Sequence, residues 1–295
     1  MSESMMKLSV GPILTYWARE TVFEFYQMVA DSAADIVYIG ETVCSRRHEL
    51  RVSDWMDVAD MLAERGKEVV LSTQVLIESN SELATQRRLT SNGRYMVEAN
   101  DMGAVQRAAG AFVAGPHLNL YNGGSLELMA TLGARRWVMP VEIGRERLAQ
   151  LGTEMPAGLE TEVFAYGRMP LAFSARCFTA RNRNLPKEDC QFSCMAHPDG
   201  LLLSTREGEP FLVLNGTQTQ SAAVQSLVAE MDDMRALGVQ VARISPQSAG
   251  TDRVIDIFDQ VRRGTLTGSV ASQQLEALMP GRPCSGFWHG DPGQE

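Results

Sequence analysis

The stretch ADIVYIGETVCSRRHELRVSDWMDVADMLAERGKEVVLST, residues 34–73, decides the fold class. It begins with the apolar run ADIVYIG (34–40), continues into DWMDVADMLAERGK (54–67) and ends on EVVLST (68–73). The middle segment has apolar residues at helical spacing, and Gly66 near its end is typical of a helix C-cap. Two apolar strands that flank an amphipathic helix predict a βαβ unit with parallel strands.

The same alternation continues along most of the chain. Further strands are expected in KLSVGPIL, RYMVEA, AFVAGPHLNLY, ARRWVMPVE, TEVFAYG and VQVARIS. With the two above, they give eight strands, centred near residues 10, 37, 70, 96, 113, 138, 163 and 242. Eight βα units in about 270 residues are what a (β/α)8 barrel requires.

A doubly wound open sheet is the alternative architecture for alternating strands and helices. Such sheets often carry a glycine-rich phosphate-binding turn, but no G-x-G-x-x-G follows the first strand and no P-loop motif occurs. We therefore predict an α/β fold of the TIM-barrel-like (β/α)8 type, with residues 1–295 as a single domain.

The alternation stops after the seventh strand, where we predict an insertion over about residues 168–216. Its first part is a cysteine-bearing loop. Its second part, LLLSTREGEPFLVLNG (201–216), is two apolar runs joined by a polar turn and predicts a β-hairpin. A helix is expected over 221–237 before the eighth strand. The Gly- and Pro-rich end, about 280–295, is expected to be a flexible tail.

The amino-acid composition disfavours some classes of function. The chain has 27 Lys and Arg against 36 Asp and Glu, a net charge of −9, which disfavours nucleic acid as the main partner. The first residues lack a basic segment followed by a sustained apolar run, and no apolar run approaches the roughly 18 residues of a membrane span. The expected location is the cytoplasm, where thiols stay reduced.

Three of the five cysteines fall in ARCFTARNRNLPKEDCQFSCMAHP (175–198), as Cys177, Cys190 and Cys194, and Cys44 follows the second strand. In a barrel, the loops after the strands open onto one face, so these four thiols are expected to meet. Four thiolates suit a structural Zn²⁺ or a [4Fe–4S] cluster. The C-x12-C-x3-C spacing is no standard metal motif, so unrelated thiols and a redox disulfide remain alternatives.

Other polar residues complete the candidate site. Arginines flank the thiols at positions 46, 47, 176, 181 and 183, and cationic neighbours favour thiolate. His117 and Asn119 follow the fifth strand and Glu142 the sixth, so they are expected at the barrel mouth. Arg243 ends the eighth strand, where barrels often bind anions. The candidates for catalysis are therefore His117, Asn119, Glu142, Arg176 and Arg243.

The segment EVFAYGRMPLAFSARC, from Glu162 to Cys177, resembles the signature of the collagenase-like peptidase (U32) family, whose members are barrel proteins. The family pattern is matched at Glu162, Phe164, Gly167, Phe173, Ser174, Arg176 and Cys177, while Ala175 replaces the usual Gly. Pro170 stands where most members carry a first Cys. Further segments, among them ETVCSRR, EANDMGAV and RISPQ, resemble one branch that acts in oxygen-independent ubiquinone biosynthesis, over about residues 7–258.

The resemblance to that branch implies a function. Its members bind a [4Fe–4S] cluster through four cysteines, which on this sequence implies Cys44, Cys177, Cys190 and Cys194 as the ligands. They pair with a homologous family member, UbiU, as a heterodimer. The pair supports hydroxylation of the ring of a ubiquinone precursor without O2, with prephenate as the implied oxygen donor. Cys284 has no matching role.

Three other functions remain open. Other branches of the family act in RNA hydroxylation, so a tRNA or rRNA hydroxylation factor is an alternative. A non-catalytic partner subunit is a second. A U32-type peptidase is a third, but it is disfavoured because the sequence has no H-E-x-x-H motif and no G-x-S-x-G nucleophile turn.

Overall fold

The computed structural model describes residues 5–294. Eight parallel strands form its centre, each hydrogen-bonded to the next, and the last of them pairs with both the seventh and the first. The sheet therefore closes into the predicted TIM barrel. Its strands are β1 (Lys7–Val10), β2 (Ile36–Ile39), β3 (Glu68–Ser72), β4 (Met96–Ala99), β5 (Phe112–Ala114), β6 (Ala134–Val138), β7 (Glu160–Phe173) and β11 (Val241–Ile244).

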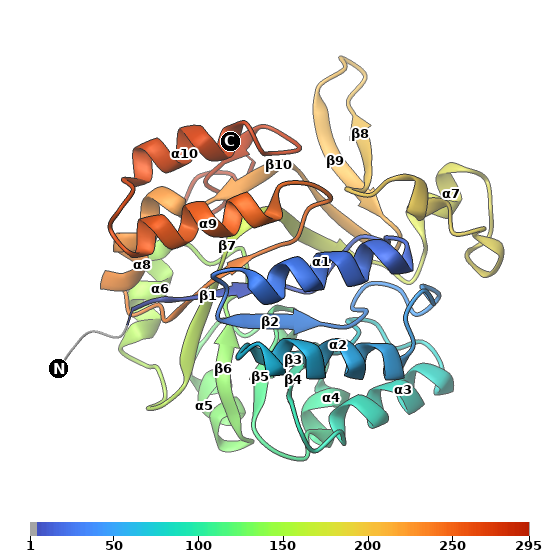
Figure 1. Ribbon diagram of the computed structural model, residues 1–295, viewed down its shortest axis with the longest axis horizontal. Coiled ribbons are helices and arrows are strands. Elements are labelled where there is room, and N and C mark those ends of the chain that lie inside the picture. The colour runs from blue at the N-terminus through green and yellow to red at the C-terminus, as the bar shows by residue number, and fades with distance from the viewer. Residues whose placement is uncertain (1–4, 295) are drawn as a thin grey trace.

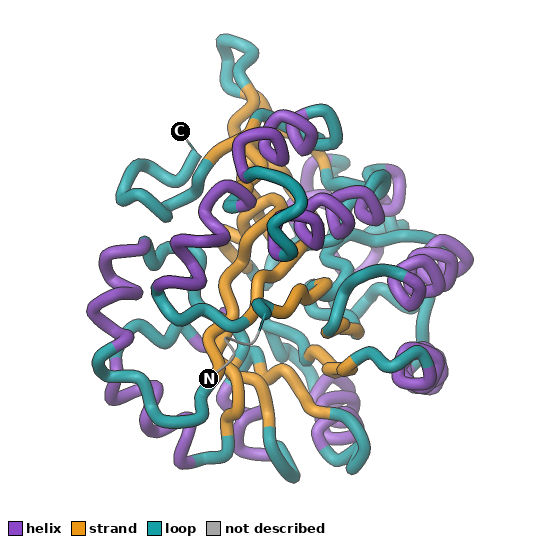
Figure 2. Tube along the Cα trace, turned by 60° about the vertical axis from the view of Figure 1, so that its left-hand side comes forward, coloured by secondary structure: helices purple, strands orange, loops and turns teal. Residues whose placement is uncertain are grey.

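Helices surround the strands, which run through the interior of the molecule (Figures 1 and 2). The main core lies between the two layers and contains large side chains such as Tyr26, Trp137 and Phe258. The helices are α1 (Arg19–Asp31), α2 (Val52–Glu64), α3 (Asn80–Thr90), α4 (Met102–Arg107), α5 (Gly123–Thr131), α6 (Arg145–Gly152), α8 (Met231–Ala236), α9 (Thr251–Arg262) and α10 (Gly268–Glu276). None of them is long and apolar enough to cross a lipid bilayer.

Short-range sequence signals set the starts of several helices. Before α3, the Ser79 hydroxyl accepts from the Glu82 N–H at 3.3 Å, and the Glu82 carboxylate accepts from the Ser79 N–H at 2.9 Å. Asp101 and Asn122 cap α4 and α5 in the same position. Each side chain satisfies a backbone N–H that has no partner inside the helix, so the loops after the strands end at fixed points.

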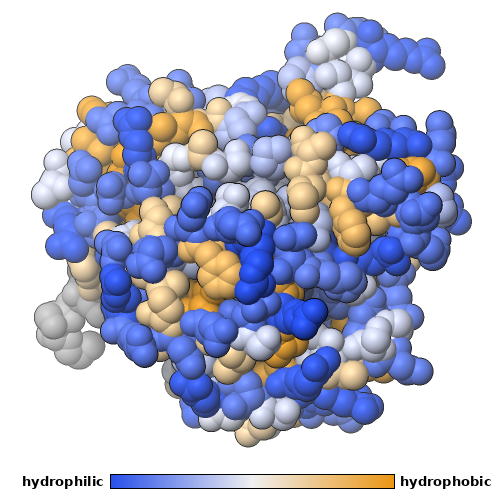
Figure 3. Space-filling model, turned by 45° about the vertical axis from the view of Figure 1, so that its right-hand side comes forward, coloured by the Kyte–Doolittle hydropathy of each residue, from blue (hydrophilic) through white to orange (hydrophobic). Residues whose placement is uncertain are grey.

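The insertion follows β7 and forms an antiparallel extension of the sheet. The predicted hairpin is confirmed as β8 (Leu201–Ser204) and β9 (Pro210–Asn215). It projects from the body, and its tip is hydrophilic (Figures 1 and 3). Between β7 and β8 lies the cysteine segment, with α7 (Phe178–Asn182) and two short 3-10 helices, Lys187–Asp189 and Ser193–Ala196.

The prediction of a helix over 221–237 is wrong in its first half. Residues Gln218–Ser226 form strand β10, and only Met231–Ala236 is α-helical. The strand pairs with β7, β9 and the two-residue β12 (Pro283–Cys284), so Ala222, Ala223 and Val224 are buried. Backbone pairing with neighbouring strands outweighs the helical preference of this segment, and the insertion extends to residue 226.

The C-terminal segment also differs from the expected flexible tail over 280–295. Trp288 is 2% exposed, and its indole N–H donates to Asp233 Oδ2 at 3.2 Å. Its backbone carbonyl accepts from the Arg145 N–H at 2.9 Å. The glycines and prolines here shape turns around a buried aromatic anchor. Residue 295 lies outside the described residues.

Gly40 directly follows β2, and we expect Gly40→Ala to destabilise the protein. Its φ is +125°, and an added Cβ would lie 2.7 Å from the Ser72 carbonyl oxygen. Because both effects cost energy, the free energy of unfolding should fall by about 1–3 kcal/mol in urea denaturation. The control is Gly152→Ala at the end of α6, where a Cβ meets nothing within 4 Å. Equal stabilities of the two variants would contradict the assignment of strain at Gly40.

Candidate metal centre and barrel mouth

The cysteine segment begins where β7 ends. Cys177 is the N-cap of α7, and its Sγ accepts from the Ala180 N–H at 3.4 Å. Cys190 is buried, and Cys177 and Cys194 are half-buried. All three thiols are free and belong to one compact lobe at the end of the barrel to which the β1 and β2 arrows point (Figure 1).

The loop that carries Cys44 is fixed by Glu41. One oxygen of this carboxylate accepts from the N–H groups of Val43 and Cys44 at 2.9 and 3.0 Å. The same oxygen lies 3.6 Å from the Arg47 guanidinium. The carboxylate therefore holds Cys44 and Arg47 in one tight turn directly after β2.

The turn between β9 and β10 joins the Cys44 loop to the cysteine segment. The Thr217 hydroxyl donates to the Val43 carbonyl at 2.7 Å, and the Thr217 carbonyl accepts from the Ser174 N–H at 2.9 Å. The neighbouring Gly216 carbonyl accepts from the Phe178 N–H at 2.8 Å. Residues next to Cys44 and on either side of Cys177 thus bond to the same two-residue turn, which brings these loops together.

Arg47 is the main cation at this junction. It is 5% exposed, donates to the Leu14 carbonyl at 2.6 Å and to Asn215 Oδ1 at 2.7 Å, and lies over the Tyr16 ring. Burial raises the pKa of the Cys194 thiol, while Arg47 acts on it in the opposite direction. A buried guanidinium beside the thiols is suited to offset negative charge on them.

Burial also raises the pKa of the Cys44 thiol, to about 11. Cys44 and Cys194 are therefore protonated at neutral pH when no metal is bound, and metal binding would release their protons. Lys187 is a further cation near Cys44 and donates to the Ala175 carbonyl of the cysteine segment at 3.0 Å.

The four thiols fit an iron–sulfur cluster in the chemistry of their donor atoms, because clusters are held by Cys thiolates. The four cysteines lie on loops that are near one another, but their side chains do not form a complete set of ligands around one point. Within residues 5–294, no group of three or more His, Cys, Asp or Glu side chains is placed to hold a metal ion. The predicted ligand set of Cys44, Cys177, Cys190 and Cys194 therefore stays a prediction.

A second polar cluster fills the barrel near its C-terminal end. Arg243 of β11 is 5% exposed and lies between two buried carboxylates, 2.7 Å from Glu162 and 2.8 Å from Glu98. Its guanidinium also lies 4.0 Å from the centre of the Tyr38 ring. Arg243 is therefore paired with two buried carboxylates inside the barrel, although its Nη2 makes no hydrogen bond of good geometry.

Glu162 is the centre of this cluster. Its carboxylate accepts from Ser9 at 2.6 Å and from the Tyr38 hydroxyl at 2.5 Å, besides its contact with Arg243. Burial raises the pKa of the Glu162 carboxyl, but Arg243 and Arg136 outweigh it, so that the net pKa lies below its usual range. The carboxylate stays charged inside the barrel because two guanidiniums neutralise it.

His117 lies at the mouth, as predicted. Its ring meets the Phe173 ring edge-to-face at 4.8 Å, directly below the start of the cysteine segment. Burial, with the charge of Arg243, lowers its pKa to about 4. The imidazole is therefore neutral at pH 7, when it offers one N–H donor and one acceptor.

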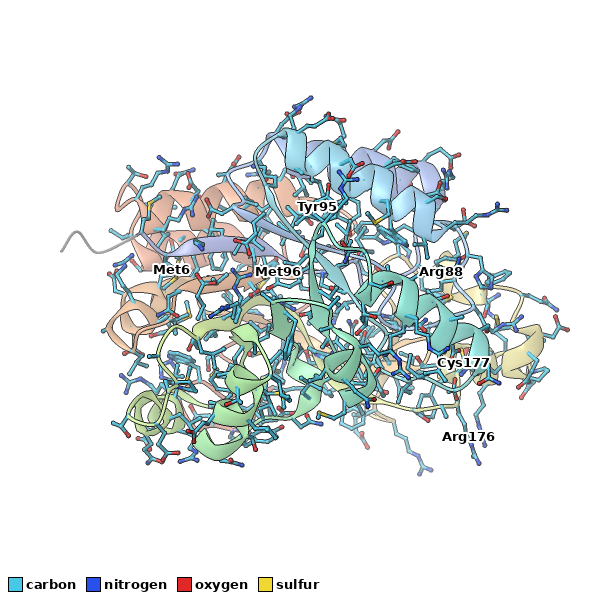
Figure 4. The ribbon with its side chains drawn as sticks, turned by 90° about the horizontal axis from the view of Figure 1, so that it is seen from below. Met6, Arg88, Tyr95, Met96, Arg176 and Cys177 are labelled. Atoms are coloured by element: carbon cyan, nitrogen blue, oxygen red, sulfur yellow. The ribbon has the colours of Figure 1, made fainter. Side chains whose placement is uncertain are left out.

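The remaining candidates lie at the surface. Asn119 is exposed, with a φ of +56°, at the end of the short helix Pro116–Leu118. Glu142 is exposed and accepts from the Tyr121 hydroxyl at 3.2 Å. Arg176 is exposed, and its side chain extends away from the body, near Cys177 (Figure 4). These three do not join the barrel cluster with His117 and Arg243.

Sequence reasoning missed several members of the buried cluster. The signal was a polar residue at an inward position of an otherwise apolar strand, where side chains alternate between the two faces. Ser9, Tyr38, Ser72, Glu98 and Arg136 all fit this description, and each is at most 1% exposed.

A family model described as Peptidase family U32 matches residues 22–295. The chain belongs to this family. Residues of the U32-like signature have structural roles here: Glu162 centres the barrel cluster, and Gly167 has a φ of +132°, where an added Cβ would lie 2.5 Å from the Ser245 side chain.

Several solved structures are similar to this U32 chain. The U32 peptidase Mk0906 is 14% identical, with a TM-score of 0.46, and the match covers 84% of this chain and 95% of that chain. A type I 3-dehydroquinate dehydratase from Clostridium difficile is 11% identical, with a TM-score of 0.44 and 94% of each chain covered. Yersinia pestis DHPS is 13% identical, with a TM-score of 0.44 and coverage of 88% and 94%.

The lowered pKa of His117 predicts a pH dependence of stability. In the unfolded chain the imidazole takes up a proton near its usual pKa of 6.5, but in the folded protein it does so only near pH 4. Stability is therefore lost as the pH falls from about 6.5 towards 4. In His117→Gln this loss should shrink by about 1–2 kcal/mol between pH 7.5 and about pH 5, measured by urea denaturation. The same pH dependence in variant and wild type would show that the imidazole is not buried.

We expect substitutions of Glu162 and Glu160, both in β7, to lower the free energy of unfolding by different amounts. Glu162→Gln leaves Arg243 and Arg136 without their shared partner, so the free energy of unfolding should fall by about 3–5 kcal/mol. Glu160→Gln is the matched control, because Glu160 also contacts Arg136 but its side chain is 31% exposed. It should cost about 1 kcal/mol or less in the same denaturation series. A smaller effect at position 162 than at 160 would contradict the role given to Glu162.

Proposed function

We propose that this U32 protein is an iron–sulfur protein of the UbiV branch, required for O2-independent hydroxylation of the ring of a ubiquinone precursor. It would bind a [4Fe–4S] cluster through Cys44, Cys177, Cys190 and Cys194. It would act with a UbiU-like homologous subunit as a heterodimer, with prephenate as oxygen donor. The proposal rests on the family membership and on the resemblance of ETVCSRR, EANDMGAV and RISPQ to that branch.

The observation that carries the proposal is the shared turn at Gly216 and Thr217. It bonds to the backbone next to Cys44 and to the backbone on both sides of Cys177. Two loops that are far apart in the sequence and carry free thiols are therefore joined through one turn, with Arg47 and Lys187 nearby, and this supports the proposal. This arrangement supports a cofactor held by cysteines more than it supports unrelated buried thiols.

The cysteine segment lies directly above the barrel mouth. Phe173 contacts His117, and four residues later the chain reaches Cys177. A cluster held there would supply one-electron chemistry. The chain's own contribution is a neutral imidazole at the mouth and a rigid, charge-balanced cluster around Arg243 below it. Near pH 7 the neutral His117 offers one N–H donor and one acceptor nitrogen for orienting a polar group at the mouth.

Anaerobic purification with iron and sulfide assays tests the cofactor. The wild type should contain about four iron and four labile sulfide per chain, with broad visible absorption. Cys177→Ser should lose most of both, since a thiolate ligand is gone. Serine also keeps an acceptor at the N-cap of α7, so the lobe stays folded. The same variant should fail to restore anaerobic ubiquinone synthesis in cells that lack the protein.

Cys284→Ala is the control for this experiment. Cys284 lies in β12, beside β10, and packs in a small cluster with Val141 and Met169. Its substitution should leave iron, sulfide and ubiquinone unchanged. One zinc per chain without labile sulfide would contradict the cofactor assignment. A full cluster content with normal ubiquinone levels in Cys177→Ser would contradict the function.

A further inference from the structure

A cavity of about 580 Å³ lies outside the barrel, between α2, α3 and the Cys44 loop. Its size falls within the range of about 300–1,000 Å³ that is common for small-molecule sites. It is separate from the barrel mouth, because neither His117 nor Arg243 lines it. Its lining also includes none of the cysteines, so the proposed cluster would not occupy it.

The cavity has an apolar wall. Five hydrophobic side chains from α2, α3 and the loops before them line it, and only one of the five is fully buried. They are Leu50, Val52, Trp55, Ile77 and Leu89. A flat apolar group placed against Trp55 would remove the exposed part of this wall from water, which is favourable.

Two buried polar side chains in the lining have atoms without a hydrogen-bond partner. Gln86 is 2% exposed, and its Oε1 has none, although its amide N–H donates to Asp101. Arg47 is 5% exposed, and its Nε has none. Both atoms are themselves buried, so they lie behind the cavity wall and are not exposed to the cavity.

The cavity is more positive than the protein as a whole. Three arginines and two carboxylates line it, whereas the chain has a net charge of −9. Both carboxylates are already used: Glu41 by Arg47 and the Cys44 loop, and Glu82 by Ser45 and the α3 cap. Arg88 on α3 is exposed and has no ion-pair partner within residues 5–294. In Figure 4 it lies towards the same end of the molecule as Cys177.

We propose that this cavity binds an amphipathic anion with a flat, aromatic-sized apolar body and one negatively charged group. The body packs against Trp55 and Leu89, and the charged group faces Arg88 at the rim. The proposal does not depend on the metal centre or on the ubiquinone assignment.

The test is calorimetric binding of 2-naphthoate to the full chain. We expect a Kd of about 0.05–1 mM, in line with the binding energy per atom of small ligands. The neutral 2-naphthamide should bind about three- to fivefold more weakly, and the cationic 2-naphthylmethylamine more weakly still. No measurable binding of 2-naphthoate, or equal binding of the anion and the cation, would overturn the proposal.

Substitutions of two adjacent arginines of α3 test where the ligand binds. Arg88 lines the cavity and Arg87 does not, although both are exposed. Arg88→Gln should weaken 2-naphthoate binding about three- to fivefold and leave 2-naphthamide unchanged, whereas Arg87→Gln should change neither. Equal effects of the two substitutions would show a non-specific charge effect and would overturn the site.

A variant that fills the cavity gives an independent readout. Thr85 of α3 lines the cavity and is only half-buried, so Thr85→Trp places a large ring in it without disturbing the barrel. Binding of 2-naphthoate should fall at least about tenfold, because the ring occupies the volume that the ligand needs. Unchanged affinity in this variant would place the naphthoate elsewhere and overturn the proposal.

Discussion

Strand β7 joins the barrel to its antiparallel extension, and the rest of the site depends on it. Its first half lies in the barrel between β6 and β11, and its second half leaves the barrel and pairs antiparallel with β10. This strand of fourteen residues thus carries the chain past Glu162 in the barrel interior to Phe173 at the mouth. The cysteine segment begins two residues later at Ala175, so its start is set by a rigid strand and not by a flexible loop.

The barrel interior shows why this strand is held firmly. Glu162 receives hydrogen bonds and charge from β1, β2 and β11, through Ser9, Tyr38 and Arg243. Removing one partner would leave a buried charge uncompensated, which is costly, so the members fix the strands relative to one another. A cluster of this kind specifies one register of the barrel, and the same register positions the mouth and the thiols above it.

The sequence predicted the barrel well because its signals are local. Apolar runs and Gly66 at a helix end act within a few positions, and all eight predicted strands are present. The helix predicted over 221–237 failed because β10 is set by pairing with β7 and β9, which no local pattern encodes. Likewise the glycines near the C-terminus led to the prediction of a flexible tail. Trp288 is buried there because it contacts the distant residues Arg145 and Asp233.

The site was predictable in its residue types and less so in its geometry. Cys44 and Cys177 were expected at one end of a barrel, and the contacts that join their loops run through Gly216 and Thr217, which carry no chemical signature. The cavity beside α3 could not be predicted from the sequence, for a related reason. Trp55 and Leu89 look like ordinary helix-core residues, and only the space left between the helices distinguishes them. Ser45 connects the two regions, because it follows Cys44 and donates to Glu82 on the cavity wall. A ligand in the cavity and a cofactor on the thiols would therefore act on the same short loop.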